Sequence, residues 1–183
     1  DGTEDNFQGI VDVVEQKYVV YTTDDGMQYE RQEVPDRLKD KLKEYRHMLL
    51  ERLADADDVV MERFLEEKEI SVDELRAAIR RAVVKSAFLP VLVGTSLRNR
   101  GVQLLLDAVC DYLPSPLDVP PISGLVPRTE EHTQRSPSPQ APLAGLVFKI
   151  ASDPYVGKLF YTRIYSGTLA SGSTVYNATR RLK

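Results

Sequence analysis

Two segments of the sequence combine residue types that bind ligands or partners. The first is Gly94-Thr95-Ser96-Leu97, which directly follows the apolar run Phe88–Val93. Loops at the carboxyl ends of buried strands are where α/β proteins hold ligands, and their backbone amides are free to face one. Every α/β protein has loops of this kind, so the pattern indicates a candidate site without naming its ligand.

The second segment, Asp55–Glu74, is rich in carboxylates and contains only two basic residues, Arg63 and Lys68. One interpretation is a solvated helical face with capping residues, which composition alone favours because exposed charges are common and contribute little. The other is an electrostatic docking surface for a basic protein. The carboxylates are Asp55, Asp57, Asp58, Glu62, Glu66, Glu67, Glu69, Asp73 and Glu74.

Other patterns indicate no chemistry. The stretch Gly167–Thr174 reads G-x-x-x-x-G-S-T, but it lacks the lysine of a phosphate-binding loop and both its flanks look like strands, so its glycines are interpreted as turn residues. Cys110 lies one helical turn from Leu106 and is predicted to be a small buried hydrophobe. His47 and His132 are far apart, which makes a His/Cys metal site improbable, and we expect His47 at the surface.

Composition describes a folded globular protein. Of 183 residues, 42% are hydrophobic and 28% are charged, which excludes a disordered or fibrous chain. No apolar run approaches the roughly 18 residues of a membrane span. A single cysteine excludes an internal disulfide and suits a reducing compartment.

The net charge of −4 divides into −9 for residues 1–122 and +5 for residues 123–183. One interpretation of this asymmetry is that the chain has two units with different neighbours and that the neighbour of the second unit is anionic. The other interpretation is chance variation of charge along the chain.

The periodicity of residues 1–122 predicts an α/β arrangement. The last helix is expected to bury Val102, Leu105, Leu106, Val109 and Leu113. In order, the expected elements are strands over Phe7–Val14, Lys17–Thr22 and Met27–Val34, a helix after Pro35, a helix capped by Asp57, a helix opened by the capping box Ser71-x-x-Glu74, a strand over Phe88–Val93 and a helix after Gly101.

A cluster of prolines indicates a boundary between two parts of the chain. Eight of the 11 prolines fall between Pro114 and Pro142, so we expect a solvated linker over residues 123–140. The period then changes to two, which predicts strands over Leu143–Ile150, Leu159–Ser166 and Thr174–Tyr176. Three strands do not close a barrel. The chain also begins at Asp1 and stops soon after a strand-like run, so it is expected to be a piece of something larger.

Four blocks of the sequence are informative when they are taken together. They are NFQGIVD at residues 6–12, YERQEVP at residues 29–35, PVLVGTSLRNRGVQLLLDAVCDYLPSPLDVPP at residues 90–121, and LVFKIASDPYVGKLFYTRIYSGTLASGSTVYN at residues 146–177. These blocks resemble the bacterial-type elongation factor G family of translational GTPases. The blocks stand in the family's order, and the resemblance extends over nearly the whole chain apart from residues 124–140. Together they are far more specific than any single short motif.

The resemblance implies a division of the chain into family domains. Residues 1–122 would be the C-terminal part of a P-loop-type GTP-binding domain of α/β fold, with an α+β insert at about residues 6–85. Residues 123–140 would be the linker, and residues 141–183 the first strands of an antiparallel β-barrel, domain II. The implied function is ribosomal translocation of tRNA and mRNA coupled to GTP hydrolysis in the cytoplasm.

The resemblance also implies site residues and partners. Gly94, Thr95, Ser96 and Leu97 match the family's fifth guanine-binding motif, where Thr-Ser here replaces the usual Ser-Ala and backbone amides help to recognise the base. The family's insert receives the ribosomal stalk protein, which favours docking at the acidic segment. Ribosomal RNA is expected near the basic second unit, and neither DNA nor a membrane is an expected partner. The docking residues are expected to be Glu66, Glu67, Glu69, Asp73 and Glu74.

The family's phosphate loop, its magnesium-binding threonine, its Asp-Gly switch with histidine and its Asn-Lys-x-Asp motif do not occur in these 183 residues. We therefore expect no catalytic and no metal-binding residue here, and GTP or GDP with Mg²⁺ only in the parent protein. Two alternatives remain: a sister translational GTPase, such as a ribosome-protection or recycling paralogue, or a non-catalytic module that binds the stalk protein.

Overall fold

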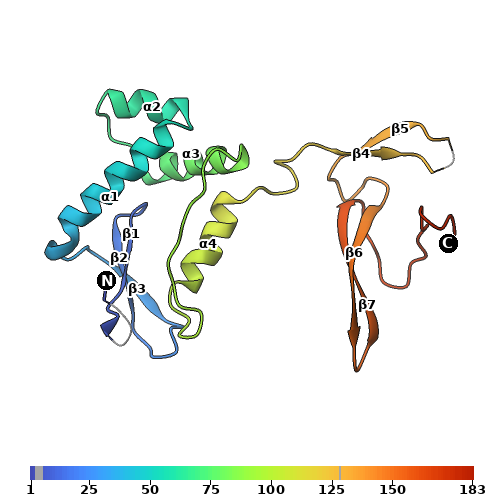
Figure 1. Cartoon of the computed structure of the whole chain (residues 1–183), viewed down its shortest axis with the longest axis horizontal. Coiled ribbons are helices and arrows are strands. Elements are labelled where there is room, and N and C mark those ends of the chain that lie inside the picture. Colours follow the sequence, from blue (N-terminus) through green and yellow to red (C-terminus); the bar gives the residue numbers. More distant parts are fainter. Residues whose placement is uncertain (3–5, 128) are drawn as a thin grey trace. The chain divides into compact units, whose positions relative to one another are not determined.

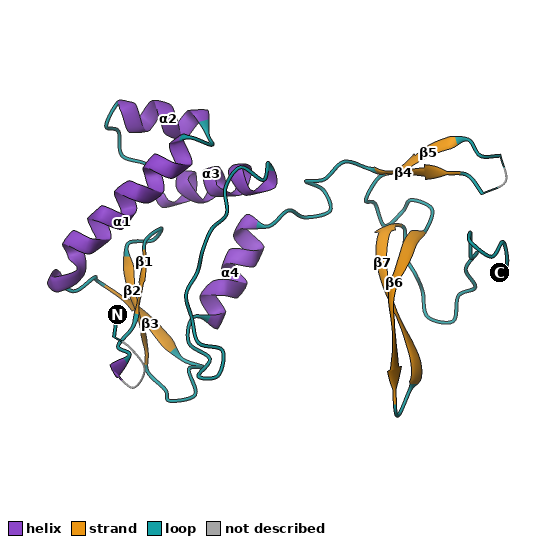
Figure 2. Cartoon of the chain, in the orientation of Figure 1, coloured by secondary structure: helices purple, strands orange, loops and turns teal. Residues whose placement is uncertain are grey.

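A computed structural model describes residues 1–2, 6–127 and 129–183, which form two compact units, Asp1–Pro114 and Ser115–Lys183 (Figure 1). The division falls at the first of the clustered prolines, before the predicted boundary at residue 122. The fold mixes helices with three small sheets, and every strand pairing in the described residues is antiparallel (Figure 2). None of the helices in the described part of the chain is long and apolar enough to cross a membrane.

Unit 1 begins with the predicted three-stranded meander. Strands β1 (Ile10–Asp12), β2 (Lys17–Tyr21) and β3 (Tyr29–Gln32) pair in the order β1-β2-β3, and each is shorter than its predicted range. Val19 of the central strand is fully buried. The meander is local because the short connections 13–16 and 22–28 join its strands, which is why the local sequence pattern predicted it.

Three helices follow, and their packing makes the main core of unit 1. They are α1 (Asp36–Ala54), α2 (Asp58–Leu65) and α3 (Val72–Val84). The completely or nearly completely buried side chains include Leu53, Leu75 and Ile79. Both predicted N-caps are confirmed. Asp57 accepts a hydrogen bond from the Val60 amide at 3.2 Å, and Ser71 and Glu74 form the capping box.

Helix α2 ends in a Schellman motif with glutamate in place of glycine. The Lys68 amide donates to the Arg63 carbonyl at 2.9 Å, and the Glu67 amide donates to the Phe64 carbonyl at 3.2 Å. Glu67 consequently has a φ of 52°, in the left-handed region that disfavours a Cβ.

Replacing Glu67 by glycine is expected to raise the free energy of unfolding by about 1 kcal/mol, because the left-handed conformation no longer strains a side chain. Chemical denaturation measures the change. Glu67→Ala removes the same charge but keeps the Cβ, so it should give no gain. Equal stability of the two variants would show that the conformation at this position is not strained.

The strand predicted at Phe88–Val93 is not present. The residues run from α3 toward α4 (Val102–Tyr112) without a regular strand, and the side chains of Leu89, Val91 and Val93 are largely exposed. An apolar run becomes a strand only when neighbouring strands take up its backbone groups. The described residues supply none beside this segment.

The predicted buried face of α4 is also wrong. The helix buries Ala108 and Tyr112, whereas Leu105, Leu106 and Val109 are exposed. Cys110 is exposed rather than buried. The prediction chose the most apolar face, but α4 packs against α3 through the side that carries Ala108 and Tyr112, and nothing in the described residues covers the other side.

Unit 2 consists of two hairpins. Strands β4 (Ile122–Leu125) and β5 (His132–Arg135) pair inside the predicted linker, so part of that proline-rich stretch is ordered as a ribbon. Strands β6 (Ala144–Asp153) and β7 (Gly157–Ser166) form the second hairpin, close to prediction. The third strand predicted at Thr174–Tyr176 is absent, and only the isolated bridge Asn177↔Leu182 follows. The described residues contain no closed barrel.

Candidate functional site

The loop between Val93 and α4 is a closed turn. The Thr95 amide donates to the Arg100 carbonyl at 2.7 Å, and the Arg100 amide donates to the Thr95 carbonyl at 3.0 Å. Two glycines make the closure possible. A Cβ on Gly94 would lie 2.8 Å from the Arg100 carbonyl oxygen, and Gly101 has a φ of 83°. The turn therefore has a defined shape without any ligand.

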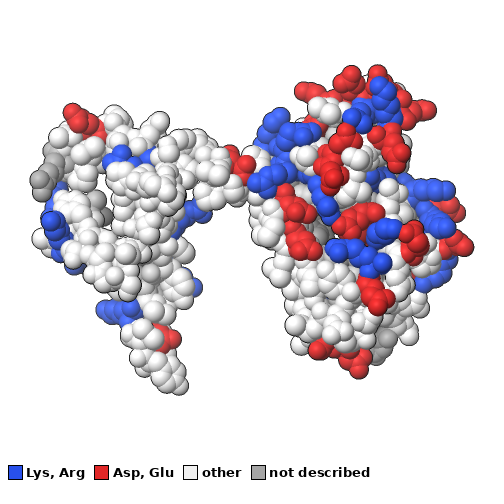
Figure 3. Space-filling model, turned by 180° about the vertical axis from the view of Figure 1, so that it is seen from behind, with Lys and Arg blue, Asp and Glu red and all other residues white. Residues whose placement is uncertain are grey.

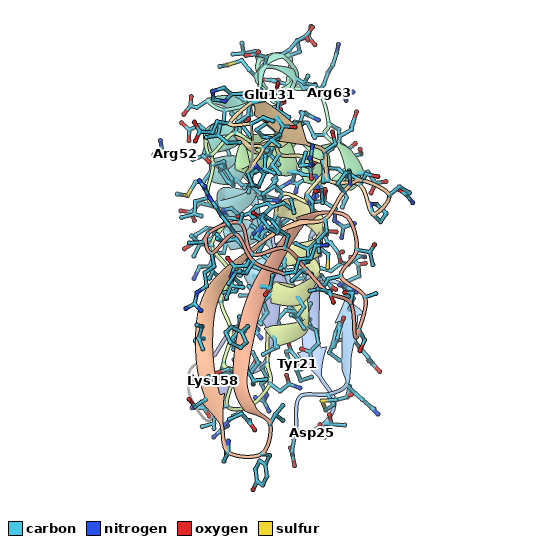
Figure 4. All side chains as sticks on the ribbon, turned by 90° about the vertical axis from the view of Figure 1, so that its right-hand side faces the viewer. Tyr21, Asp25, Arg52, Arg63, Glu131 and Lys158 are labelled. Carbon is cyan, nitrogen blue, oxygen red and sulfur yellow. The ribbon has the colours of Figure 1, made fainter. Side chains whose placement is uncertain are left out.

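The turn is held from outside by the sheet. The hydroxyl of Tyr21 accepts a hydrogen bond from the Gly101 amide, and the Gln103 side chain donates to the Gly26 carbonyl at 2.8 Å. The Arg100 guanidinium lies 5.1 Å from the centre of the Phe7 ring. Tyr21 and Asp25 lie at the end of unit 1 that is remote from Arg63 of α2 (Figure 4). The loop therefore belongs to the end of the unit opposite α2.

The structure separates the roles of the four predicted nucleotide-binding residues. The Thr95 amide is occupied by the turn itself, so it is not free to face a ligand. Among the described residues, no hydrogen bond engages the amides of Ser96 or Leu97, and the Leu97 side chain is almost fully exposed. The two amides at the tip, rather than the Thr95 amide, are the available donors. Gly94 supplies shape only.

Ion pairs and hydrogen bonds fix the helix that carries this loop. Asp107 of α4 pairs with Arg31 of β3 at 3.8 Å, and Asp111 of α4 pairs with Arg76 of α3 at 3.7 Å. Arg80 of α3 donates to the Asp111 carbonyl at 3.0 Å, at the last turn of α4. The helix is thus held by both the sheet and α3, which limits the positions that the loop can adopt. Sequence patterns gave no sign of this network because its members are distant in sequence.

The predicted docking carboxylates fall into two groups. Glu74 accepts hydrogen bonds from Ser71 and lies 2.5 Å from Arg63, and the Ser71 hydrogen bonds, followed by the positive charge of Arg63, lower the pKa of Glu74. Glu66 is paired with Lys68 at 2.8 Å. These two carboxylates are compensated within the unit, so they are weaker candidates for docking than the sequence suggested.

Glu67, Glu69 and Asp73 are the uncompensated group. All three are exposed, and no ion pair within the described residues engages their carboxylates. In the space-filling view, acidic side chains gather at the end of unit 1 that carries α2, with a few basic ones among them (Figure 3). This exposed negative end is the surface best suited to attract a basic partner.

The described residues do not form a metal site. They contain no group of three or more His, Cys, Asp or Glu side chains arranged to hold an ion. The free donors at the loop tip are amides, which suit a carbonyl or an anionic oxygen and not a cation. The loop tip therefore offers donors to an oxygen acceptor of a ligand, and the described residues offer no ligand set for Mg²⁺ beside it.

No protein-family model matches the chain. Solved structures are similar to it, and one of them illustrates the extent of the similarity. The protein ttk003000868 from Thermus thermophilus matches with a TM-score of 0.66 and 27% sequence identity, over 92% of this chain and 22% of that one. The similarity reaches into both units, since neither unit alone amounts to 92% of the chain. This chain thus spans about a fifth of the length of its structural relative.

Proposed function

We propose that the chain is part of a translational GTPase of the elongation factor G family, with α2 and the loop that follows it docking the ribosomal stalk protein. The observation that carries the proposal is the uncompensated acidic group Glu67, Glu69 and Asp73 at one exposed end of unit 1. Its support comes from the sequence blocks in the family's order and from a loop preformed at the position of the guanine motif.

The two ends of unit 1 would have different tasks in this proposal. The acidic end would bring the protein to the ribosome, because opposite charges accelerate association. At the other end, the amides of Ser96 and Leu97 would donate to the guanine oxygen. GTP hydrolysis by the parent protein would depend on a phosphate loop and switches that these residues do not include. A sister translational GTPase would use the same two ends.

The chain alone is expected to bind GTP and GDP only weakly and to show no turnover. Phosphoryl transfer relies on positioning and charge neutralisation at the phosphates, and the described residues offer no metal site for it. Titration with a fluorescent guanine nucleotide and a phosphate-release assay measure both properties. Turnover by the purified chain would contradict the proposed division of labour.

Competition on the ribosome tests the proposed function. Intact elongation factor G hydrolyses GTP repeatedly on ribosomes, and an excess of this chain should slow it by occupying the stalk protein. A chain carrying Glu67→Lys, Glu69→Lys and Asp73→Lys is the matched control and should not slow turnover. Equal turnover with and without the unmodified chain would contradict stalk docking.

A further inference from the structure

The outer face of α2 carries two apolar side chains that nothing in the described residues covers. Met61 and Leu65 are one helical turn apart and are 39% and 73% exposed. The opposite side of the helix faces the core of unit 1, where Val60 is buried and Phe64 packs against the buried cluster. The pair is therefore additional to the packing of unit 1.

Carboxylates border this apolar pair. Asp58 and Glu62 share the exposed side of α2 with Met61 and Leu65, since Asp58 stands three residues before Met61 and Glu62 stands three residues before Leu65. Glu67 and Glu69 follow just beyond the end of the helix. The nearby cations are already engaged in the unit. They are Arg63, paired with Glu74 and bonded to the Glu69 carbonyl, and Lys68, paired with Glu66.

We propose that Met61 and Leu65 are the apolar centre of the docking surface, and that the partner contributes a helix whose apolar residues, one turn apart, are bordered by Lys or Arg. The inference rests on the proposed docking function and adds the residues that determine specificity. Charge complementarity selects this occupant. A second copy of α2 or an anionic membrane would bring like charges against the carboxylate border.

The apolar centre and the charged border should affect binding differently. Apolar side chains that become buried at the middle of an interface mainly slow dissociation, and their contribution is insensitive to salt. Border charges mainly accelerate association, and salt screens them. The two contributions can therefore be separated by combining substitution with a change of ionic strength.

Titration calorimetry of the chain with the C-terminal domain of the ribosomal stalk protein tests the inference. Leu65→Ser is expected to weaken binding about tenfold or more, by the same factor at about 50 and about 300 mM salt. Val59→Ser is the matched control, since Val59 is 56% exposed on another side of the same helix, and it should change affinity less than about twofold. Thermal unfolding of both variants verifies that they are folded.

The outcomes separate the inference from the proposed function. Binding that Leu65→Ser leaves unchanged would overturn the inference and leave stalk docking intact. Absence of binding by the unmodified chain would overturn stalk docking. In that case a helical peptide of about 18 residues, with a leucine stripe bordered by lysines, is the second probe. The inference is upheld if this peptide binds, if Leu65→Ser weakens that binding, and if the same peptide with glutamates in place of its lysines does not bind. Absence of binding by the lysine peptide would overturn the inference.

Discussion

Asp57→Ala is expected to lower the free energy of unfolding by about 2–4 kcal/mol, through loss of a helix cap and of hydrogen bonds from a charged partner. The Asp57 side chain is only 5% exposed, and both its oxygens accept from the Arg81 guanidinium, at 2.8 and 3.0 Å. The same carboxylate caps α2 through the Val60 amide. Alanine removes the cap and leaves Arg81 of α3 without its carboxylate partner, so the contact between α2 and α3 weakens.

Urea denaturation measures this loss. Asp57→Asn keeps an acceptor for the cap but loses the charge opposite Arg81, so a smaller loss of about 1–2 kcal/mol is expected. If Asp57→Ala cost less than about 1 kcal/mol, the pair with Arg81 and the cap would not be formed in solution.

The same carboxylate predicts how stability depends on pH. The hydrogen bonds from Arg81, followed by the one from the Val60 amide, hold the pKa of Asp57 below its ordinary value of 3.8, against the opposing effect of burial. Because the pKa of Asp57 is lowered in the folded state, its carboxylate contributes fully to the free energy of unfolding above about pH 4. This contribution is lost as the pH falls through the pKa of the folded state. Stability of the unmodified chain should therefore fall more steeply below pH 4 than that of Asp57→Ala. Parallel pH profiles would contradict this assignment.

Reversal of the uncompensated acidic group has the second large expected effect. A chain with Glu67→Lys, Glu69→Lys and Asp73→Lys should bind the stalk protein's C-terminal domain at least about 100-fold more weakly at low salt, because three attractive contributions become repulsive. The loss should shrink as salt is raised, since these side chains are exposed and screened. The free energy of unfolding should change little, because none of the three carboxylates is engaged in an ion pair within the described residues.

A variant with equal net charge controls for this reversal. Asp24→Lys, Asp40→Lys and Glu44→Lys change three exposed carboxylates outside the acidic segment, in the β2–β3 turn and on α1. Their reversal should reduce affinity less than about threefold, through long-range charge alone. Similar losses in the two triple variants would mean that overall charge, and no defined surface, governs binding.

Features set by neighbouring residues in the sequence were predictable. The caps at Asp57 and Ser71 depend on residues within one helical turn, and both are present as predicted. The compensation of Glu74 by Arg63 was not apparent, because the pair joins the end of α2 to the first turn of α3. The occupied Thr95 amide was also missed, since only the folded turn brings it to the Arg100 carbonyl.

Features that depend on distant partners were not predictable. The run Phe88–Val93 has the composition of a buried strand, yet the described residues place no strand beside it. The buried side of α4 was decided by contact with α3 and not by apolar content, so Cys110 became exposed. The ribbon of β4 and β5 in a proline-rich stretch required a pairing that composition does not reveal.

Chemical-shift perturbation tests stalk docking most directly. Unlabelled stalk C-terminal domain is added to the isotope-labelled chain, and the backbone amide signals are followed by NMR. Stalk docking predicts perturbations concentrated between residues 58 and 74, with those of Leu65 and Glu67 among the largest, while the Gly94–Gly101 loop at the other end of unit 1 stays unchanged. Absence of perturbation, or perturbation confined to residues outside 58–74, would contradict it.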